Sequence, residues 1–273
     1  MDRKKNRKKL LFIIIIVIFT CGPVFGQLTG NNKKSKLGIG LGYSFNGYRE
    51  ETIVDINRYL NTFFFTLNYN LEKNRLMHTI GAGFYRGISK AVIASPVYIY
   101  EIQPDIYGQL YQYYQAEDTW TRFFLEYAQD WKLWGNSTFP GYFGGAVRAD
   151  IYLIETLINP VYINFSGIIS LDLHISQKWI INAKNSLVLS LSFPFFGYAI
   201  RPHYIGFSAW PVENRITSLH NYWAGFGNLK YYFAISRLFS LYSDIGFELS
   251  NINFPRPRKD AAFRICLGIA WTF

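Results

Sequence analysis

The last eleven residues of the chain alternate between large apolar side chains and other residues without a break. From residue 263 to residue 273, every odd position is Phe, Ile, Leu or Trp, whereas the even positions carry Arg, Cys, Gly, Ala and Thr. A period of two residues predicts a β-strand with one apolar and one polar face. Related patterns predict nine further strands, so the chain is predicted to be all-β. The predicted strands are residues 36–46, 60–71, 76–87, 120–131, 142–153, 164–177, 186–196, 221–233, 239–250 and 262–273.

The apolar faces of these strands have no evident soluble core to enter. The chain is 50% hydrophobic and 19% aromatic. After residue 26, no apolar run approaches the roughly 18 residues that indicate a transmembrane helix. Membrane insertion would therefore use strands, and an open sheet edge in hydrocarbon would leave backbone groups unpaired. The pattern predicts a closed antiparallel up-and-down transmembrane β-barrel of about ten strands.

The connections between the predicted strands alternate in length after the first strand. Residues 72–75, 132–141, 178–185 and 234–238 are short, whereas 47–59, 88–119, 197–220 and 251–261 are mostly longer. Short turns facing the periplasm and long loops facing outward are typical of such barrels. Twelve strands are the alternative, because residues 98–102 and 106–114 could form another hairpin. Ten are favoured, because Pro96 and Pro104 cannot donate to a ladder.

The C-terminal strand resembles that of Gram-negative outer-membrane β-barrels, in which a terminal Phe and alternating apolar residues are read by the barrel-insertion machinery. Trp271 and Phe273 carry this resemblance at the end of the chain. The resemblance implies an outer-membrane location, with membrane lipid, lipopolysaccharide and the insertion machinery as partners. It implies a fold and a compartment, and it supplies no activity.

The N-terminus has the features of a secretory signal peptide. Six cations between residues 3 and 9 precede an apolar run at 10–19, and small residues follow as far as Gly26. We therefore expect residues 1–26 to be removed, 27–35 to form a short periplasmic segment, and 36–273 to form the barrel. Lipid attachment at Cys21 is a competing interpretation, which the Thr before it disfavours.

Removal of the signal peptide halves the net charge. The full chain has 28 Lys and Arg against 18 Asp and Glu, and the loss of six cations and Asp2 lowers the net charge from +10 to +5. No compact basic-aromatic patch replaces the lost cations, so no nucleic-acid partner is expected. Cys266 is the one cysteine after residue 26. This excludes an internal disulfide and a thiolate metal cluster, and neither a metal nor a cofactor is expected.

Charged residues within the strands fall on the face opposite the apolar one, where they would line the lumen. Placing these charges on the lumen face is favourable, because a cation on the lipid face near the bilayer midplane costs about 2–4 kcal/mol. Hairpin register then predicts four ion pairs. The pairs are Arg122–Asp150, Glu126–Arg148, Lys230–Asp244 and Glu248–Arg264. We expect a salt-bridged and largely filled lumen, since wide aqueous pores need about 16 strands.

Asp172, His174 and Ser176 are the candidates for catalysis, because they share one face of the strand at 164–177. An imidazole beside a carboxylate is a common way to orient a general base. Their predicted place is inside the lumen, towards the periplasmic half. Outer-membrane rim proteases act at the outer mouth instead, so a hydrogen-bonded structural network is the favoured interpretation.

The last connection, 251–261, carries three cations beside two prolines, namely Arg256, Arg258 and Lys259. At the outer surface they could contact the anionic groups of lipopolysaccharide. The sequence as a whole favours an integral outer-membrane barrel with a structural, accessory or surface-binding role. A narrow channel for small solutes is the second interpretation. A rim enzyme, either a protease or a lipid A acyl hydrolase, is the third.

Overall fold

The structure is a computed structural model that describes most of the chain after residue 32. The described residues are 33–51, 55–73, 75–93, 117–156, 163–202, 212–253 and 257–273. The predicted signal peptide and the Cys21 alternative lie outside them. The strands are β1 (Lys33–Glu51), β2 (Asp55–Lys73), β3 (Leu76–Ile93), β4 (Glu117–Trp134), β5 (Gly141–Thr156), β6 (Ile163–Ile180), β7 (Asn185–Pro202), β8 (Val212–Ser218), β9 (Tyr222–Ala234), β10 (Phe239–Ile252) and β11 (Arg258–Thr272).

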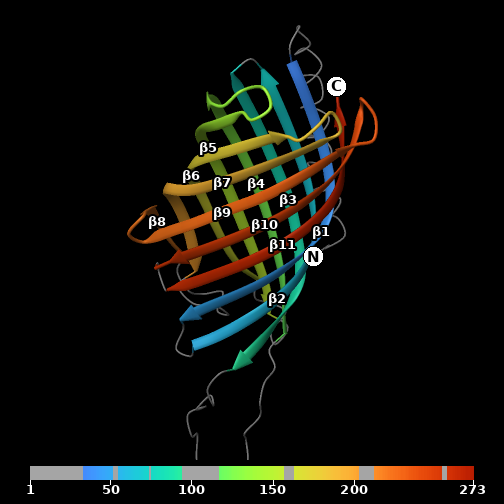
Figure 1. Cartoon of the computed structure of the whole chain (residues 1–273). Helices are drawn as coiled ribbons and strands as arrows, with labels where there is room; N and C mark the ends of the chain where they lie inside the picture. Colours follow the sequence, from blue (N-terminus) through green and yellow to red (C-terminus); the bar gives the residue numbers. More distant parts are fainter. Residues whose placement is uncertain are drawn as a thin grey trace, which may run out of the picture.

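Neighbouring strands pair antiparallel, and the sheet closes into a barrel (Figure 1). β1 pairs with both β2 and β11, and β6 pairs with β7. β8 pairs with the second half of β7 and β9 with the first half, so β8 and β9 share one place in the wall. The wall therefore has ten strand places. Closure removes the sheet edges that hydrocarbon could not satisfy.

The observed strands extend beyond the predicted ones. β1 runs to Glu51 and β2 begins at Asp55, so the connection predicted at 47–59 is short. In the sequence, residues 47–51 and 55–59 are mostly polar, so they do not continue the apolar alternation. β3 pairs directly with β4, so the ten-strand prediction is confirmed over the twelve-strand alternative. β8 was not predicted, because its sequence, Val-Glu-Asn-Arg-Ile-Thr-Ser, is short and mostly polar.

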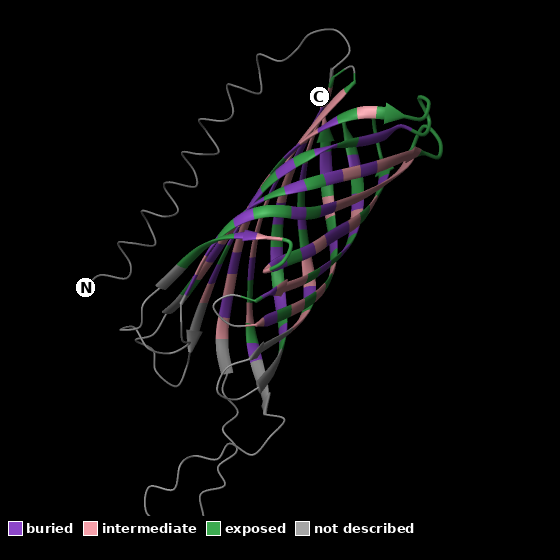
Figure 2. Cartoon of the chain, turned by 90° about the vertical axis from the view of Figure 1, so that its left-hand side faces the viewer, coloured by how far each residue is buried: buried purple, intermediate pink, exposed green. Residues whose placement is uncertain are grey.

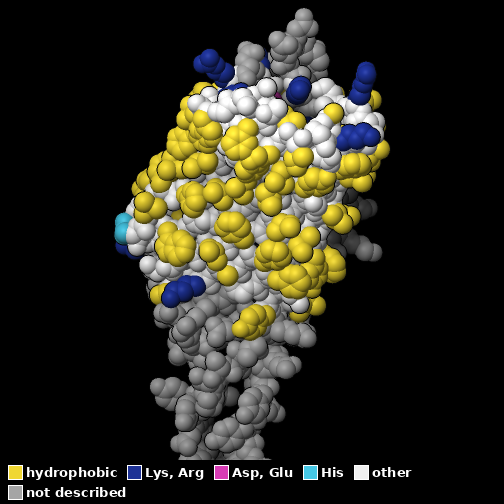
Figure 3. All heavy atoms as spheres, in the orientation of Figure 1, with side chains coloured by type: hydrophobic (Ala, Val, Ile, Leu, Met, Phe, Trp, Pro, Cys, Tyr) yellow, Lys and Arg dark blue, Asp and Glu magenta, His cyan; other side chains and the backbone are white. Residues whose placement is uncertain are grey.

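Side chains alternate between the lumen and the outer face. Along β11, Ile265 and Leu267 are 44% and 68% exposed, whereas Cys266 between them is 2% exposed. Figure 2 shows this alternation of buried and exposed positions along the strands. In Figure 3 hydrophobic side chains cover much of the visible outer face, and Lys and Arg lie mainly near its ends. In the described part of the chain, no helix is long and apolar enough to span a membrane.

β7 breaks the regular ladders on both of its sides around Pro194. The β6–β7 register shifts between Leu171 and Asp172. On the other side, the turn at 219–221 separates β8 from β9 opposite the same stretch of β7. Proline has no N–H to donate to a neighbouring strand. Pro194 thus lies where the β7–β9 pairing has ended and the β7–β8 pairing has not yet begun.

The start of β1 and the last residue of the chain meet at one end of the barrel. The Phe273 N–H donates to the Ser35 carbonyl at 3.0 Å, and the Ser35 N–H donates to the Phe273 carbonyl at 3.1 Å. We call this the turn end, because each of its four connections has six residues or fewer; it is uppermost in Figure 1. The opposite end is the loop end. The turn-end connections are residues 74–75, 135–140, 181–184 and 235–238.

Candidate functional site

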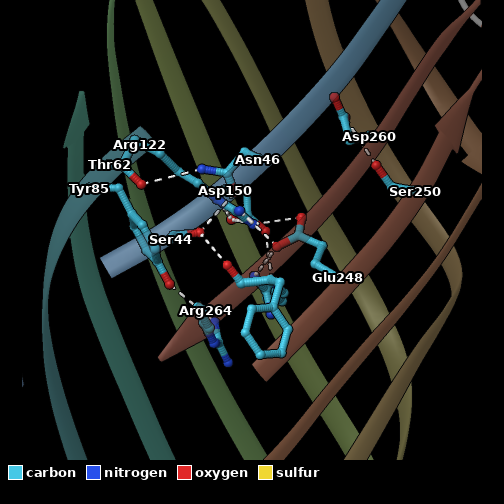
Figure 4. A network of polar contacts seen from close by, with 12 residues as sticks. Ser44, Asn46, Thr62, Tyr85, Arg122, Asp150, Glu248, Ser250, Asp260 and Arg264 are labelled. Atoms are coloured by element: carbon cyan, nitrogen blue, oxygen red, sulfur yellow. Dashed lines mark hydrogen bonds and ion pairs between the residues drawn. The ribbon is translucent and has the colours of Figure 1, made fainter. Parts of the chain in front are cut away.

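A buried ion pair from opposite walls crosses the lumen. Arg122 on β4 donates through Nη1 and Nη2 to the two carboxylate oxygens of Glu248 on β10, at 2.7 and 2.9 Å. β4 and β10 lie five places apart in the ten-place wall, which is across the barrel. The side chains are 5% and 10% exposed. Figure 4 shows the two residues reaching towards each other through the lumen.

Further charges join this pair in what we call the ion cluster, which consists of Arg122, Glu126, Arg148, Asp150 and Glu248. Arg122 Nε donates to one Asp150 oxygen at 2.8 Å, and Arg148 Nε donates to the other at 2.6 Å. Arg148 Nη1 donates to Glu126 at 3.2 Å. Two guanidinium groups thus meet three carboxylates. Removal of one partner from such a buried set costs about 3–5 kcal/mol, because buried charged groups lose a hydrogen-bonded counter-charge.

Aromatic rings pack around the ion cluster, and some of them line the lumen on its loop side. The Arg148 guanidinium lies 3.8 Å from the centroid of Phe226, and that of Arg122 lies 5.0 Å from Tyr152. Both distances are within the range of cation–π attraction. On the loop side, a cavity lined by described residues, Tyr152 among them, measures only about 10 Å³. One water needs about that much room.

Three of the four predicted lumen pairs are in contact in the structure. Two of them belong to the ion cluster. The third joins β9 to β10, where Lys230 Nζ is 3.8 Å from Asp244 Oδ2 and the two residues face each other in the ladder. Lys230 also donates to the side-chain oxygen of Asn68 at 3.2 Å.

The fourth predicted pair, Glu248 with Arg264, is wrong. Arg264 lies opposite Gly246, and Glu248 lies opposite Ala262, so the register differs by two residues from the prediction. Arg264 instead donates to the Tyr85 hydroxyl at 3.1 Å. Gly246 makes this placement possible, because a β-carbon there would collide with the Arg264 side chain. Glu248 is left to serve the ion cluster.

His174 is held by an acid that the sequence did not single out. Its Nδ1 lies 2.9 and 2.8 Å from the two carboxylate oxygens of Asp130 on β4. Gly144 of β5 lies between them, paired with Asp130 on one side and with His174 on the other. A β-carbon on Gly144 would collide with Asp130. Because Gly144 has no side chain, Asp130 can reach the His174 imidazole across β5. This contact can be predicted only when the β4–β5 and β5–β6 registers are both known.

Asp172 and Ser176 share the lumen face of β6 with His174 but do not orient it. Asp172 accepts a hydrogen bond from the Ser192 hydroxyl on β7 at 2.9 Å. The Ser176 hydroxyl is buried and has no hydrogen-bond partner among the described residues. The acid that orients the imidazole is therefore Asp130, and the three candidate residues are not joined in a catalytic chain.

The cations of the last connection do not form one outward patch. Arg258 is 7% exposed, and its Nε donates to Asp260 at 2.9 Å. Its guanidinium faces the Tyr152 ring at 5.2 Å. The expectation that Arg258 reaches the outer surface is wrong, because the strand parity of β11 turns it into the lumen. Lys259 is exposed, and Arg256 lies outside the described residues.

The C-terminal aromatic residues lie on the outer face, where Trp271 is 47% and Phe273 48% exposed. Trp271 stacks on Phe239 with ring centroids 6.2 Å apart, and Phe273 meets Trp271 edge-on at 5.7 Å. These rings lie at the turn end, beside the backbone contacts that join β11 to β1. Their part in recognition by the insertion machinery stays a prediction.

On the turn side of the ion cluster, the lumen holds a cavity of about 490 Å³. Its lining extends from Arg148 to Lys184 and Arg237 in the turns, and includes His174 and Ser176. Charged, hydroxyl and amide groups contribute much of its wall. No group of three or more His, Cys, Asp or Glu residues in the described part of the chain is arranged to hold a metal ion.

No protein-family model and no curated protein matches this sequence. Among solved structures, the outer membrane protease OmpT of Escherichia coli is similar, with a TM-score of 0.53 and 6% identity over 90% of this chain and 98% of that chain. The translocator domain of the autotransporter NalP from Neisseria meningitidis gives a TM-score of 0.41 and 9% identity over 98% of each chain. Ail of Yersinia pestis gives 0.32 and 13% over 88% of this chain and 99% of that chain. The chain has the closed antiparallel β-barrel fold that occurs in outer-membrane proteins such as OmpT.

Proposed function

We propose that the protein is an integral outer-membrane β-barrel with a closed lumen, and that its role is structural, accessory or in binding at the outward surface. The outer face supports membrane insertion, because side chains as apolar as Phe63 and Leu41 are 74% and 68% exposed. Large exposed apolar surfaces of this kind mark contact with a membrane or a partner. The short connections favour a turn end that faces the periplasm.

The Arg122–Glu248 ion pair is the main support for the proposal that the lumen is closed. It joins opposite walls by two charge-assisted hydrogen bonds between buried groups. Bidentate pairs of this type are strong and fixed in geometry. A solute passing through the barrel would have to break them and then displace the rings that line the loop side.

Planar-bilayer recording tests the closed lumen. The purified wild type is expected to give no discrete conductance steps. The double variant Arg122→Ala with Glu248→Ala removes the ion pair that crosses the lumen and leaves neither of its two charges without a partner. It should produce conductance steps. Lys259→Ala, on the outer face, is the matched control and should stay silent. Steps in the wild type would overturn the proposal in favour of a narrow channel, the second candidate, which the cavity of about 490 Å³ supports.

Heat-modifiable gel migration tests the membrane barrel. An unboiled sample from the outer-membrane fraction should run as a compact band that shifts on boiling. Deletion of Phe273 should lower the yield of this band, because we propose that the insertion machinery reads the C-terminal strand. A soluble periplasmic product without a shift would contradict the proposal.

The remaining interpretations have less support from the geometry. His174 is buried within the turn-side half of the lumen and not at the loop-end rim, so the site offers no basis for a rim protease or a lipid A acyl hydrolase. Contact with lipopolysaccharide stays a proposal for the loop end. The exposure of Lys259, among the described cations of the last connection, supports this proposal.

A further inference from the structure

The turn-side cavity is a pocket with one closed end. The ion cluster blocks it towards the loop end, and its lining reaches the turn residues Lys184 and Arg237 at the other end. Its volume of about 490 Å³ lies within the roughly 300–1,000 Å³ of small-molecule sites. A space of this size that ends at a fixed barrier suits binding better than passage.

Positive charge predominates in the lining of this cavity. Eight Lys and Arg residues line it, against three Asp and Glu. Each acid is already engaged: Glu72 with Lys178 at 2.8 Å, Asp244 with Lys230, and Glu126 within the ion cluster. The other lining cations form no ion pair with an acid in the described part of the chain; they are Lys34, Lys36, Lys184, Arg237 and Arg264.

These five cations lie at three depths. Lys34, Lys184 and Arg237 are exposed at the mouth, where water and salt weaken their contacts. They still raise the local concentration of anions, because a cleft lined by one sign of charge focuses its field. Lys36 and Arg264 are only partly exposed. Arg264 lies deepest, because it faces Ser44 of β1, eight residues along the ladder from Lys36. Lys36 Nζ lies 4.0 Å from the centroid of Tyr232, a contact that leaves its positive charge without an anion.

An unpartnered hydroxyl in the same wall points independently to a ligand. Ser176 is 1% exposed, lines the cavity and has no hydrogen-bond partner among the described residues. A buried polar group without a partner costs about 1–3 kcal/mol. A ligand oxygen that accepts the Ser176 proton would remove this cost.

We propose that the turn-side cavity binds a small soluble polyanion, with at least two phosphate or carboxylate groups, that enters from the turn end. One anionic group lies near Lys36, the Ser176 hydroxyl donates to a ligand oxygen, and the mouth cations attract the ligand. Binding of this kind does not depend on conductance. Failure of the closed-lumen proposal would appear as current steps, whereas failure of this inference would appear as absent binding.

Isothermal titration of the full barrel in detergent tests the inference, with inorganic pyrophosphate as the probe, citrate as the carboxylate counterpart and spermidine as the cationic control. Pyrophosphate or citrate should bind with a dissociation constant below about 1 mM, and raised salt should weaken binding, as expected for charge attraction. Spermidine should not bind. The stronger of the two anions tells phosphate from carboxylate chemistry.

Two variants locate the site. Lys36→Gln should weaken anion binding at least about tenfold, because a hydrogen bond to a charged group contributes about that much. Ser176→Ala removes a single buried oxygen and should weaken it several-fold. Lys259→Gln, at the far end of the barrel, should bind as the wild type does. Heat-modifiable migration confirms that each variant is folded. Absence of anion binding to the wild type, or unchanged affinity in both cavity variants, would overturn the inference.

Discussion

Gly144 and Gly246 each lie beside a charged side chain of a neighbouring strand. Gly144 leaves room for Asp130 to reach His174, and Gly246 leaves room for Arg264. A barrel of ten strands has a narrow interior that side chains must fill. At the residue scale, the contacts inside this lumen thus depend on where side chains are absent as well as on where charges are present.

The substitution Gly144→Ala tests the need for this free space, and Gly145→Ala on the same strand is the control. The new β-carbon would collide with Asp130 and with the backbone of Gln129, so we expect a loss of about 1–3 kcal/mol, as for other overpacked sites. Gly145→Ala points outward, where the nearest atom within 4 Å is a carbonyl oxygen at 3.7 Å, and should be nearly neutral. Urea unfolding in lipid vesicles gives both values. Equal effects would contradict the steric argument.

Glu248→Ala should destabilise the barrel more than an outer-face substitution does. It leaves the Arg122 guanidinium buried without its bidentate partner, at a cost of about 3–5 kcal/mol. The same vesicle unfolding assay measures it. Adding Arg122→Ala should cost less than the sum of the two single changes, since partners in one network are not additive. Strict additivity would mean that the pair is not coupled.

At the element scale, the sequence pattern determines strands and faces but not all registers. The alternation around Cys266 predicted its buried position correctly, because a period of two needs no knowledge of neighbours. Register depends also on each connection, and a two-residue difference between β10 and β11 was enough to separate Arg264 from Glu248. The Asp130–His174 contact spans three strands, so it required two registers and a glycine at once.

Because the odd-numbered residues of β11 lie on the outer face, the cost of placing an arginine there should depend on its depth in the membrane. Leu267 is 68% exposed on the outer face near the middle of the strand, so Leu267→Arg should cost about 2–4 kcal/mol of folding free energy in vesicles. Ala261 lies on the same face near the loop end, and Ala261→Arg should cost about 0–1 kcal/mol. A larger cost at Ala261 would show that the membrane is centred elsewhere on the barrel.

At the scale of the whole molecule, the strands are longer than a membrane needs. β1 and β2 have 19 residues each, which corresponds to roughly 60 Å of strand. At the usual tilt of about 35–45°, this gives a height of about 45 Å, against an apolar band about 25 Å tall. Part of the wall therefore extends beyond the hydrocarbon.

Cysteine labelling in intact cells tests which end of the barrel extends beyond the membrane. Lys259→Cys, exposed near the loop end of β11, should react with a membrane-impermeant maleimide. Leu267→Cys, on the same face eight residues further along the strand, should be protected by lipid. Wild-type Cys266 is buried and provides the unlabelled background. Labelling of Leu267→Cys alone would reverse the inferred placement.

The Arg122–Glu248 ion pair between opposite walls also affects how the barrel assembles. Arg122 and Glu248 are separated by 126 positions in the chain, and they can meet only when the sheet has curled round enough to bring β4 and β10 face to face. Contacts between such distant residues make folding slow. They also bind early and late parts of the chain into one cooperative unit. While β1 and β11 are unpaired, the two charges of the pair stay hydrated. When β1 and β11 pair and the barrel closes, the two charges bind each other and hold the opposite walls together.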